Sequence, residues 1–172
     1  MGELRKLANA KIEAEQEKLL ALLPGEIEAL KRKNAPKGLL RSGNTILGVV
    51  EICTDALDSL GKTVIEQYRW AIAQSLLASQ SWVEELVSGA PERLQPLLER
   101  CTEHVTHVAN FVGAPNLAAE CAAKLEAKVA AISNDIALSL RSSFAERKRG
   151  LVRSLVGSVG GWLSKLIGVG KP

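Results

Sequence analysis

The sequence contains few aromatic residues, few cysteines and few histidines. Three tryptophans, two phenylalanines, one tyrosine, three cysteines and two histidines stand among 172 residues. Hydrophobic residues nevertheless make up 47% of the chain, and alanine and leucine are prominent among them. A core of this composition is aliphatic and is typical of packed helices. The length suits one domain with a sizeable core.

The three cysteines, Cys53, Cys101 and Cys121, are odd in number, which argues against a disulfide framework. Each lies on or beside an apolar stripe of helical spacing. Buried, reduced thiols are therefore predicted, as in cytoplasmic proteins.

The chain also lacks a long apolar run. The longest stretch without Asp, Glu, Lys or Arg extends from His104 to Ala119, and it contains Gly113 and Pro115. A spanning helix needs roughly 20 apolar residues, more than this stretch provides. The first residues are too polar for a secretory signal peptide. We predict a cytoplasmic location, with peripheral attachment to a membrane as a further expectation.

No pattern of residues indicates catalysis. Residues 60–63, Leu-Gly-Lys-Thr, match the end of a phosphate-binding loop, but Ala56 stands where the first glycine of that motif belongs. Cys101, His104 and His107 share one expected helix, yet steps of about 100° per residue turn them away from a common point. The sequence thus predicts no enzyme, no catalytic residue, no metal, no cofactor and no small-molecule substrate.

The strongest positive signal is an apolar stripe over residues 45–87. Its members recur every three or four positions, as on one face of a helix. They are Ile46, Val49, Val50, Cys53, Leu57, Leu60, Val64, Tyr68, Ile72, Leu76, Ser79, Val83 and Leu86. This spacing predicts one long central helix, with Gly61 as the place where it bends.

Shorter stripes and turn residues predict the remaining elements. Helices are expected over residues 3–22, 25–33, 91–112 and 116–149, separated by Pro24-Gly25, a loop over 34–44, and the Gly-Ala-Pro sequences at 89–91 and 113–115. The predicted fold is all-α, an antiparallel helical bundle of four to five helices with an amphipathic C-terminal helix. Three parts are expected: N-terminal helices and a basic loop (1–44), the bundle core (45–150) and a Gly-rich C-terminal segment (151–172).

Charge is distributed unevenly along the chain. The net charge is +3 for residues 1–44, −6 for residues 45–135 and +6 for residues 136–172. Basic residues gather in two clusters that are candidate contacts for an anionic partner. They are Lys31, Arg32, Lys33, Lys37 and Arg41 in the first cluster, and Arg147, Lys148, Arg149 and Arg153 in the second. Compensation of helix-end dipoles is the alternative explanation of both clusters, and no base-stacking aromatic residue lies near the first in sequence.

The C-terminal segment combines apolar residues with glycines and with no acidic residue. Candidate contacts with a membrane or another hydrophobic surface are Leu151, Leu155, Val159, Trp162, Leu163, Leu166 and Ile167. A cationic amphipathic helix of this kind lies in a bilayer interface. Packing on the bundle, pairing with a second copy, and a disordered tail are the alternatives.

The Ala-rich amphipathic helices, with a helix that starts at the proline of residues 113–117, Gly-Ala-Pro-Asn-Leu, are loosely similar to those of the granule-coating phasins. The predicted function is a non-enzymatic helical interaction or scaffold protein that self-associates or binds another helical protein, and that docks on an anionic membrane or hydrophobic surface through its C-terminal segment. A nucleic-acid-associated protein that uses its basic ends is the alternative.

Overall fold

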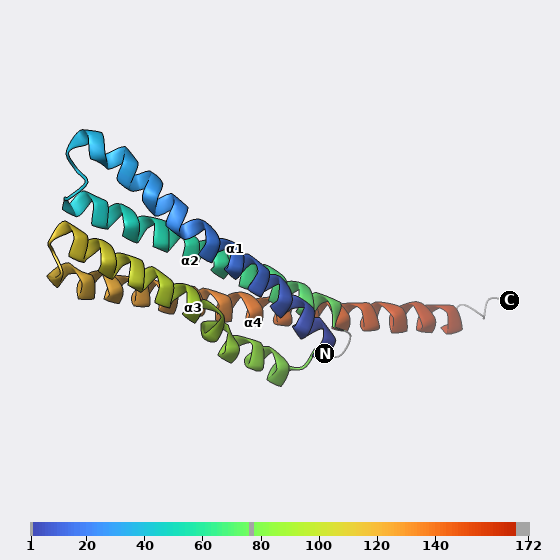
Figure 1. Ribbon diagram of the computed structural model, residues 1–172. Helices are drawn as coiled ribbons and strands as arrows, with labels where there is room; N and C mark the ends of the chain where they lie inside the picture. Colours follow the sequence, from blue (N-terminus) through green and yellow to red (C-terminus); the bar gives the residue numbers. More distant parts are fainter. Residues whose placement is uncertain (1, 76–77, 168–172) are drawn as a thin grey trace.

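The chain folds into four long helices and contains no strand in the part that the computed structural model describes, which is the backbone of residues 2–75 and 78–167 and the side chains up to Arg149. The helices are α1 (Gly2–Asn34), α2 (Gly43–Gln74), α3 (Gln80–Val112) and α4 (Asn116–Ile167), with a short 3-10 helix, η1 (Ala35–Lys37), after α1. Short connections make consecutive helices antiparallel (Figure 1). The all-α prediction is confirmed, with four helices where the sequence left four or five open.

Helix α2 is the element that packs extensively against all three other α-helices. It packs along α1, α3 and α4, whereas α1 has only a few contacts with α3. The predicted stripe on this helix forms the seam of the core: its side chains from Val49 to Ile72 are buried or half-buried. Cys53, Cys101 and Cys121 are free and buried, as predicted.

The predicted single helix over residues 45–87 is wrong, because the chain turns after Gln74. Ser75 lies at the end of α2 and donates its N–H to the Ala71 carbonyl at 3.1 Å. The Ser79 hydroxyl caps α3 by accepting the Trp82 N–H at 3.2 Å. Serine side chains compete with helical backbone hydrogen bonds and favour caps, so they can end one helix and start the next. The apolar spacing continues on both sides of this turn and therefore did not predict it. Gly61, the expected bend, lies inside α2 and is buried.

The expected breaks at Pro24-Gly25 and at residues 88–91 are also wrong. Helix α1 continues through Pro24, and α3 continues through Pro91 and Pro96. An interior proline removes one backbone hydrogen bond and costs about 3 kcal/mol. Leu23 and Ile27 are buried beside Pro24, so the packing of both flanks offsets this cost in α1. Figure 1 shows that α3, by contrast, bends along its length.

The corner at residues 113–116 is confirmed. Gly113 adopts a φ of 83°, and its N–H reaches the carbonyls of Ala109 and Asn110. This left-handed conformation is easy for glycine and ends α3. Helix α4 then begins at Asn116.

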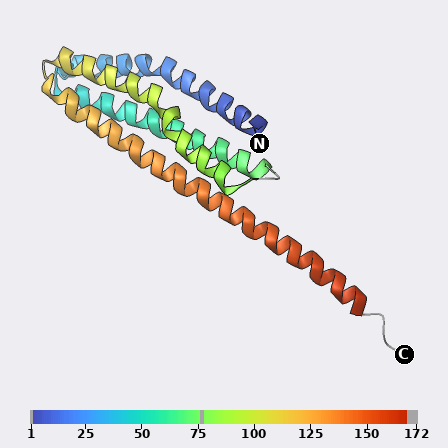
Figure 2. The same cartoon turned by 90° about the horizontal axis from the view of Figure 1, so that it is seen from below.

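The expected end of α4 at Gly150 is wrong, since the helix runs to Ile167. Figures 1 and 2 show its C-terminal part projecting beyond the other three helices. We call residues 150–167 of α4 the α4 extension. Gly150 does not cap α4. A left-handed cap requires a positive φ, and among the described residues only Gly38 and Gly113 have one.

Candidate functional site

The two predicted basic clusters lie at opposite ends of the bundle. Lys31, Arg32, Lys33, Lys37 and Arg41 surround the α1–α2 connection, whereas Arg147, Lys148 and Arg149 lie where α4 leaves the bundle (Figure 1). Helix α2 separates these ends and has 32 residues, which at a rise of 1.5 Å per residue gives roughly 48 Å. The clusters therefore form two separate surfaces.

The first cluster includes an aromatic residue that lies far away in the sequence. Lys31 Nζ is 5.9 Å and the Arg41 guanidinium 5.5 Å from the centre of the Phe111 ring. Phe111, at the end of α3, is 39% exposed. Lys31 also pairs with Glu28 at 2.7 Å, which lowers the pKa of that glutamate. The expectation that no aromatic residue lies beside this cluster is thus wrong for the folded chain, because the fold brings Phe111 next to it.

The α1–α2 connection that carries this cluster is fixed by buried hydrogen bonds. Asn34 Nδ2 donates to Thr45 Oγ1 at 2.9 Å, and Thr45 Oγ1 donates to the Leu39 carbonyl at 2.9 Å. Both Asn34 and Thr45 are buried. Buried polar groups that are fully paired hold a loop in one conformation, so Lys37 and Arg41 project from a defined connection.

The second cluster lies beside an open pocket of about 480 Å³ between the last turns of α2 and the part of α4 just before the α4 extension. Arg147 donates a hydrogen bond to the Ile72 carbonyl near the end of α2. The Nζ of Lys11, on α1, lies 5.2 Å from the centre of the Trp70 indole ring. Such cation–π pairs hold the ring in place. The pocket is lined by Arg69, Trp70, Ile72, Ala73, Ser143, Glu146 and Arg147.

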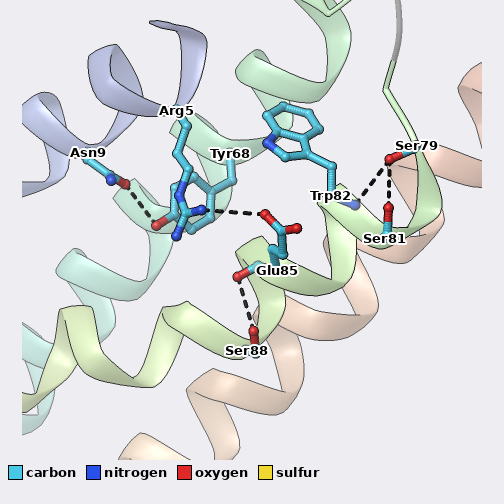
Figure 3. A network of polar contacts seen from close by, with 8 residues as sticks. All are labelled: Arg5, Asn9, Tyr68, Ser79, Ser81, Trp82, Glu85 and Ser88. Carbon is cyan, nitrogen blue, oxygen red and sulfur yellow. Dashed lines mark hydrogen bonds and ion pairs between the residues drawn. The ribbon is translucent and has the colours of Figure 1, made fainter. Parts of the chain in front are cut away.

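A polar network ties α1, α2 and α3 together at this same end of the bundle (Figure 3). Tyr68 donates its hydroxyl to Asn9 Oδ1 at 3.0 Å, and Arg5 pairs with Glu85 at 3.6 Å. Burial raises the pKa of the Tyr68 hydroxyl, although nearby Arg93 partly opposes the shift. The tyrosine is therefore a neutral structural donor and not a general base.

The cysteines and histidines of α3 do not converge on a common point. Cys101 is buried against Cys53 of α2, and each thiol approaches the other residue's carbonyl, at 3.9 and 4.0 Å. The Cys53 contact and burial raise the pKa of the Cys101 thiol. His104 is half-buried and His107 exposed; burial, then Arg100, lowers the pKa of His104. Within the described part of the chain no three His, Cys, Asp or Glu side chains gather as metal ligands.

Sequence reasoning missed the side chains that the fold adds to each cluster. Phe111 joins the first, and Arg69, Trp70 and Glu146 surround Arg147 in the second. Helical spacing of 3.6 residues per turn places Arg69 and Trp70 off the buried stripe of α2, but it does not say which helix they approach. Their partner depends on how α2 and α4 pack.

The predicted tail contacts lie outside the residues whose side chains are described. These are Leu151, Leu155, Val159, Trp162, Leu163, Leu166, Ile167 and the cation Arg153. The structure gives their backbone as part of α4. Within the described residues, no helix is both long enough and apolar enough to cross a membrane.

Comparison with known proteins identifies no relative of this chain, so the fold and these two surfaces are the features that bear on its function. No family model, no curated protein and no solved structure matches the chain.

Proposed function

We propose that the protein is a non-enzymatic helical scaffold that docks on a membrane surface through the α4 extension. The observation that carries this proposal is the continuation of α4 beyond the end of the bundle (Figure 2). A helix that leaves its bundle needs another surface for its apolar face, because short isolated helices are marginal in water.

The residue pattern of the extension supports a lipid surface. In an ideal helix with about 100° per residue, its large apolar residues fall on one arc of roughly 160°. The opposite arc holds only small residues and two cations. The apolar residues are Leu151, Val152, Leu155, Val156, Val159, Trp162, Leu163, Leu166 and Ile167, and the opposite arc contains Arg153, Ser154, Gly157, Ser158, Gly160, Gly161, Ser164 and Lys165.

The glycines of the extension fall on the polar arc of this ideal helix. They therefore leave the apolar face uninterrupted and keep the polar face small. A helix with a large apolar face and a weakly charged polar face binds mainly by insertion among acyl chains, whereas cations add attraction to anionic headgroups. We therefore expect binding to small, highly curved vesicles to exceed binding to large ones, with a smaller gain from anionic lipid.

Vesicle flotation tests the proposal. The full chain is expected to float with small phosphatidylcholine–phosphatidylglycerol vesicles, whereas a chain truncated after Gly150, or the full chain with Leu155→Ser and Trp162→Ser, stays at the bottom. Leu47→Ser with Leu138→Ser is the matched control, because these leucines are 60% and 67% exposed on the bundle itself. Equal flotation of the full and truncated chains would contradict the proposal.

The same face supports self-association in the absence of lipid. Two copies can cover their apolar arcs by pairing the α4 extensions, which is the usual twofold arrangement. Without vesicles the full chain is then expected to have a solution mass above the 18.4 kDa of one chain, and the truncated chain a mass near that of a monomer. A monomeric full chain would remove self-association from the proposal and leave the lipid role.

Nucleic-acid binding is the second candidate, and the position of Phe111 favours it. An exposed aromatic ring beside two cations can stack on a base while the cations contact phosphates. Binding of single-stranded RNA or DNA that weakens steeply with salt and is lost in Phe111→Ala would support this candidate. Indifference to both nucleic acids at low salt would exclude it.

A further inference from the structure

The pocket between α2 and α4 contains charges of both signs that do not neutralise each other. Arg69 and Arg147 supply two guanidinium groups, and Glu146 supplies a carboxylate. Among the described side chains, Arg69 and Glu146 form no ion pair with each other or with any other residue. The Ser142 hydroxyl donates a long hydrogen bond of 3.5 Å to Glu146 Oε1. Both signs of charge are therefore available to a ligand.

The guanidinium groups suit a phosphate. Arginine presents several N–H donors in a planar fork that matches phosphate oxygens. The hydrogen bond from Arg147 to the Ile72 carbonyl holds that side chain in place, so little rotamer entropy is lost when it binds. Ser143 adds a hydroxyl to the same lining.

The carboxylate excludes a purely anionic ligand and suits an ammonium group. Glu146 repels the second negative charge of a phosphate monoester, but it attracts a cation a few ångströms from a phosphodiester. A ligand with one negative and one positive group fits this lining better than inorganic phosphate does. The half-buried Trp70 and the buried Ile72 give the same pocket an apolar wall.

The position of the pocket indicates where such a ligand comes from. Arg147 lies three residues before Gly150, about 5 Å along the helix axis from the start of the α4 extension. If the extension lies in a bilayer interface, lipid headgroups are within reach of the pocket. We infer that this pocket binds the phosphoethanolamine headgroup of a membrane lipid, with the phosphate on Arg69 and Arg147 and the ammonium group on Glu146. The inference builds on the proposed membrane role, but soluble headgroup compounds test it without a membrane.

Titration of the full chain with glycerophosphoethanolamine tests the pocket directly. With ¹⁵N-labelled tryptophan, the indole signal of Trp70, assigned with Trp70→Phe, is expected to shift in a saturable manner. Glycerophosphocholine, which lacks ammonium N–H donors, and inorganic phosphate are expected to bind more weakly. No saturable shift of the Trp70 signal, or equal affinity for all three compounds, would overturn the inference.

Charge-removing variants separate phosphate binding by the arginines from ammonium binding by Glu146. Arg69→Gln is expected to weaken every phosphate compound by about tenfold, whereas Glu146→Gln is expected to abolish the preference for glycerophosphoethanolamine over glycerophosphocholine. Lys62→Gln and Glu126→Gln are the matched controls, because both side chains are exposed, lie outside both basic clusters and do not line the pocket. An unchanged preference in Glu146→Gln would overturn the assignment of the ammonium site.

Vesicles distinguish this inference from the proposed function. At equal anionic charge and size, vesicles that contain phosphatidylethanolamine are expected to bind the full chain more tightly than those without it, and soluble headgroup compound is expected to compete. If the soluble compound binds but no vesicle does, the membrane role is wrong and the pocket stands. If vesicles bind without regard to phosphatidylethanolamine, the α4 extension acts alone and the headgroup site is wrong.

Discussion

At Gly61 the absence of a side chain lets α2 pack closely against Ile132 of α4. A Cβ built at Gly61 would lie 2.4 Å from Ile132 Cγ2 and 3.7 Å from Ile132 Cβ. A β-branched side chain in a helix has one strongly preferred χ1 rotamer, so Ile132 cannot swing aside cheaply. Gly61 therefore stabilises the protein by allowing α2 and α4 to pack closely, although glycine has a low helix propensity.

Gly61→Ala is expected to lower the free energy of unfolding by about 1–2 kcal/mol. Overpacking a core costs about 1–3 kcal/mol, and the gain in helix propensity of about 1 kcal/mol offsets only part of that cost. Urea unfolding monitored by circular dichroism measures the change. Gly25→Ala is the control, since nothing lies within 4 Å of a Cβ at that position, and it is expected to stabilise the protein by about 0.5–1 kcal/mol. A stabilising Gly61→Ala would contradict the close approach.

At the scale of elements, ion pairs connect helices whose apolar seams already hold them together. Arg141 of α4 makes a bidentate contact with Glu84 of α3, with Nε–Oε1 at 2.9 Å and Nη2–Oε2 at 2.6 Å. Glu13 of α1 and Arg93 of α3 pair at 2.8 Å, where the direct packing between these two helices is slight. Since such pairs are exposed, we expect them to set the alignment of neighbouring helices more than the total stability.

The Glu84–Arg141 pair gives stability a dependence on pH. The hydrogen bond from Arg141 lowers the pKa of Glu84 in the folded protein below its ordinary value of 4.5. The contribution of the pair is therefore present above pH 4.5 and is lost as the pH falls through the lowered pKa. Glu84→Gln is expected to be slightly less stable than the wild type near neutral pH, with a difference that shrinks on acidification.

Denaturant unfolding at a series of pH values measures this difference. Glu126→Gln is the control, because Glu126 lies on the exposed side of α4 and forms no ion pair among the described residues. A difference between Glu84→Gln and the wild type that stayed constant from neutral to acidic pH would show that the carboxylate charge of Glu84 plays no part.

At the scale of the whole molecule, the α4 extension projects beyond the bundle (Figure 2). Every buried hydrophobic side chain in the described part of the chain lies between Ala8 and Leu140. The extension begins one turn after Arg147, which still contacts α2. The bundle therefore contains a complete core of its own, and the extension is a helix carried by it.

Truncation after Gly150 is expected to leave the bundle intact. Its urea unfolding should remain cooperative, with a free energy of unfolding within about 0.5 kcal/mol of the full chain, because surface changes away from the core have effects of that size. The helical signal of the truncated chain should fall only by the contribution of the missing residues. A large loss of stability would mean that the extension packs on the bundle, which would also contradict the proposed membrane role.

The sequence by itself determined the fold class, the core and one corner. Three- and four-residue spacing of Val49, Cys53, Leu57, Leu60 and Val64 fixed which side of α2 is buried, because only one face of a helix can pack against neighbours. Gly113 fixed the end of α3, because glycine adopts the left-handed conformation without a steric penalty. Both are local effects, and both are confirmed.

Tertiary structure alone decided which expected breaks remain helical and which side chains meet at the ends of the helices. Pro24 remains inside α1 because packing of its neighbours Leu23 and Ile27 offsets a local cost. The serines around residues 75–79 end α2 although the apolar spacing runs on. Phe111 reaches Lys31 and Arg41, and Glu146 reaches the pocket beside Arg69, through helix pairing that brings together residues distant in sequence. The local cost of a helix breaker is about 1–3 kcal/mol at a position. Burial of a single large apolar side chain contributes as much. Where local propensity and packing disagree, the packing of several side chains therefore prevails.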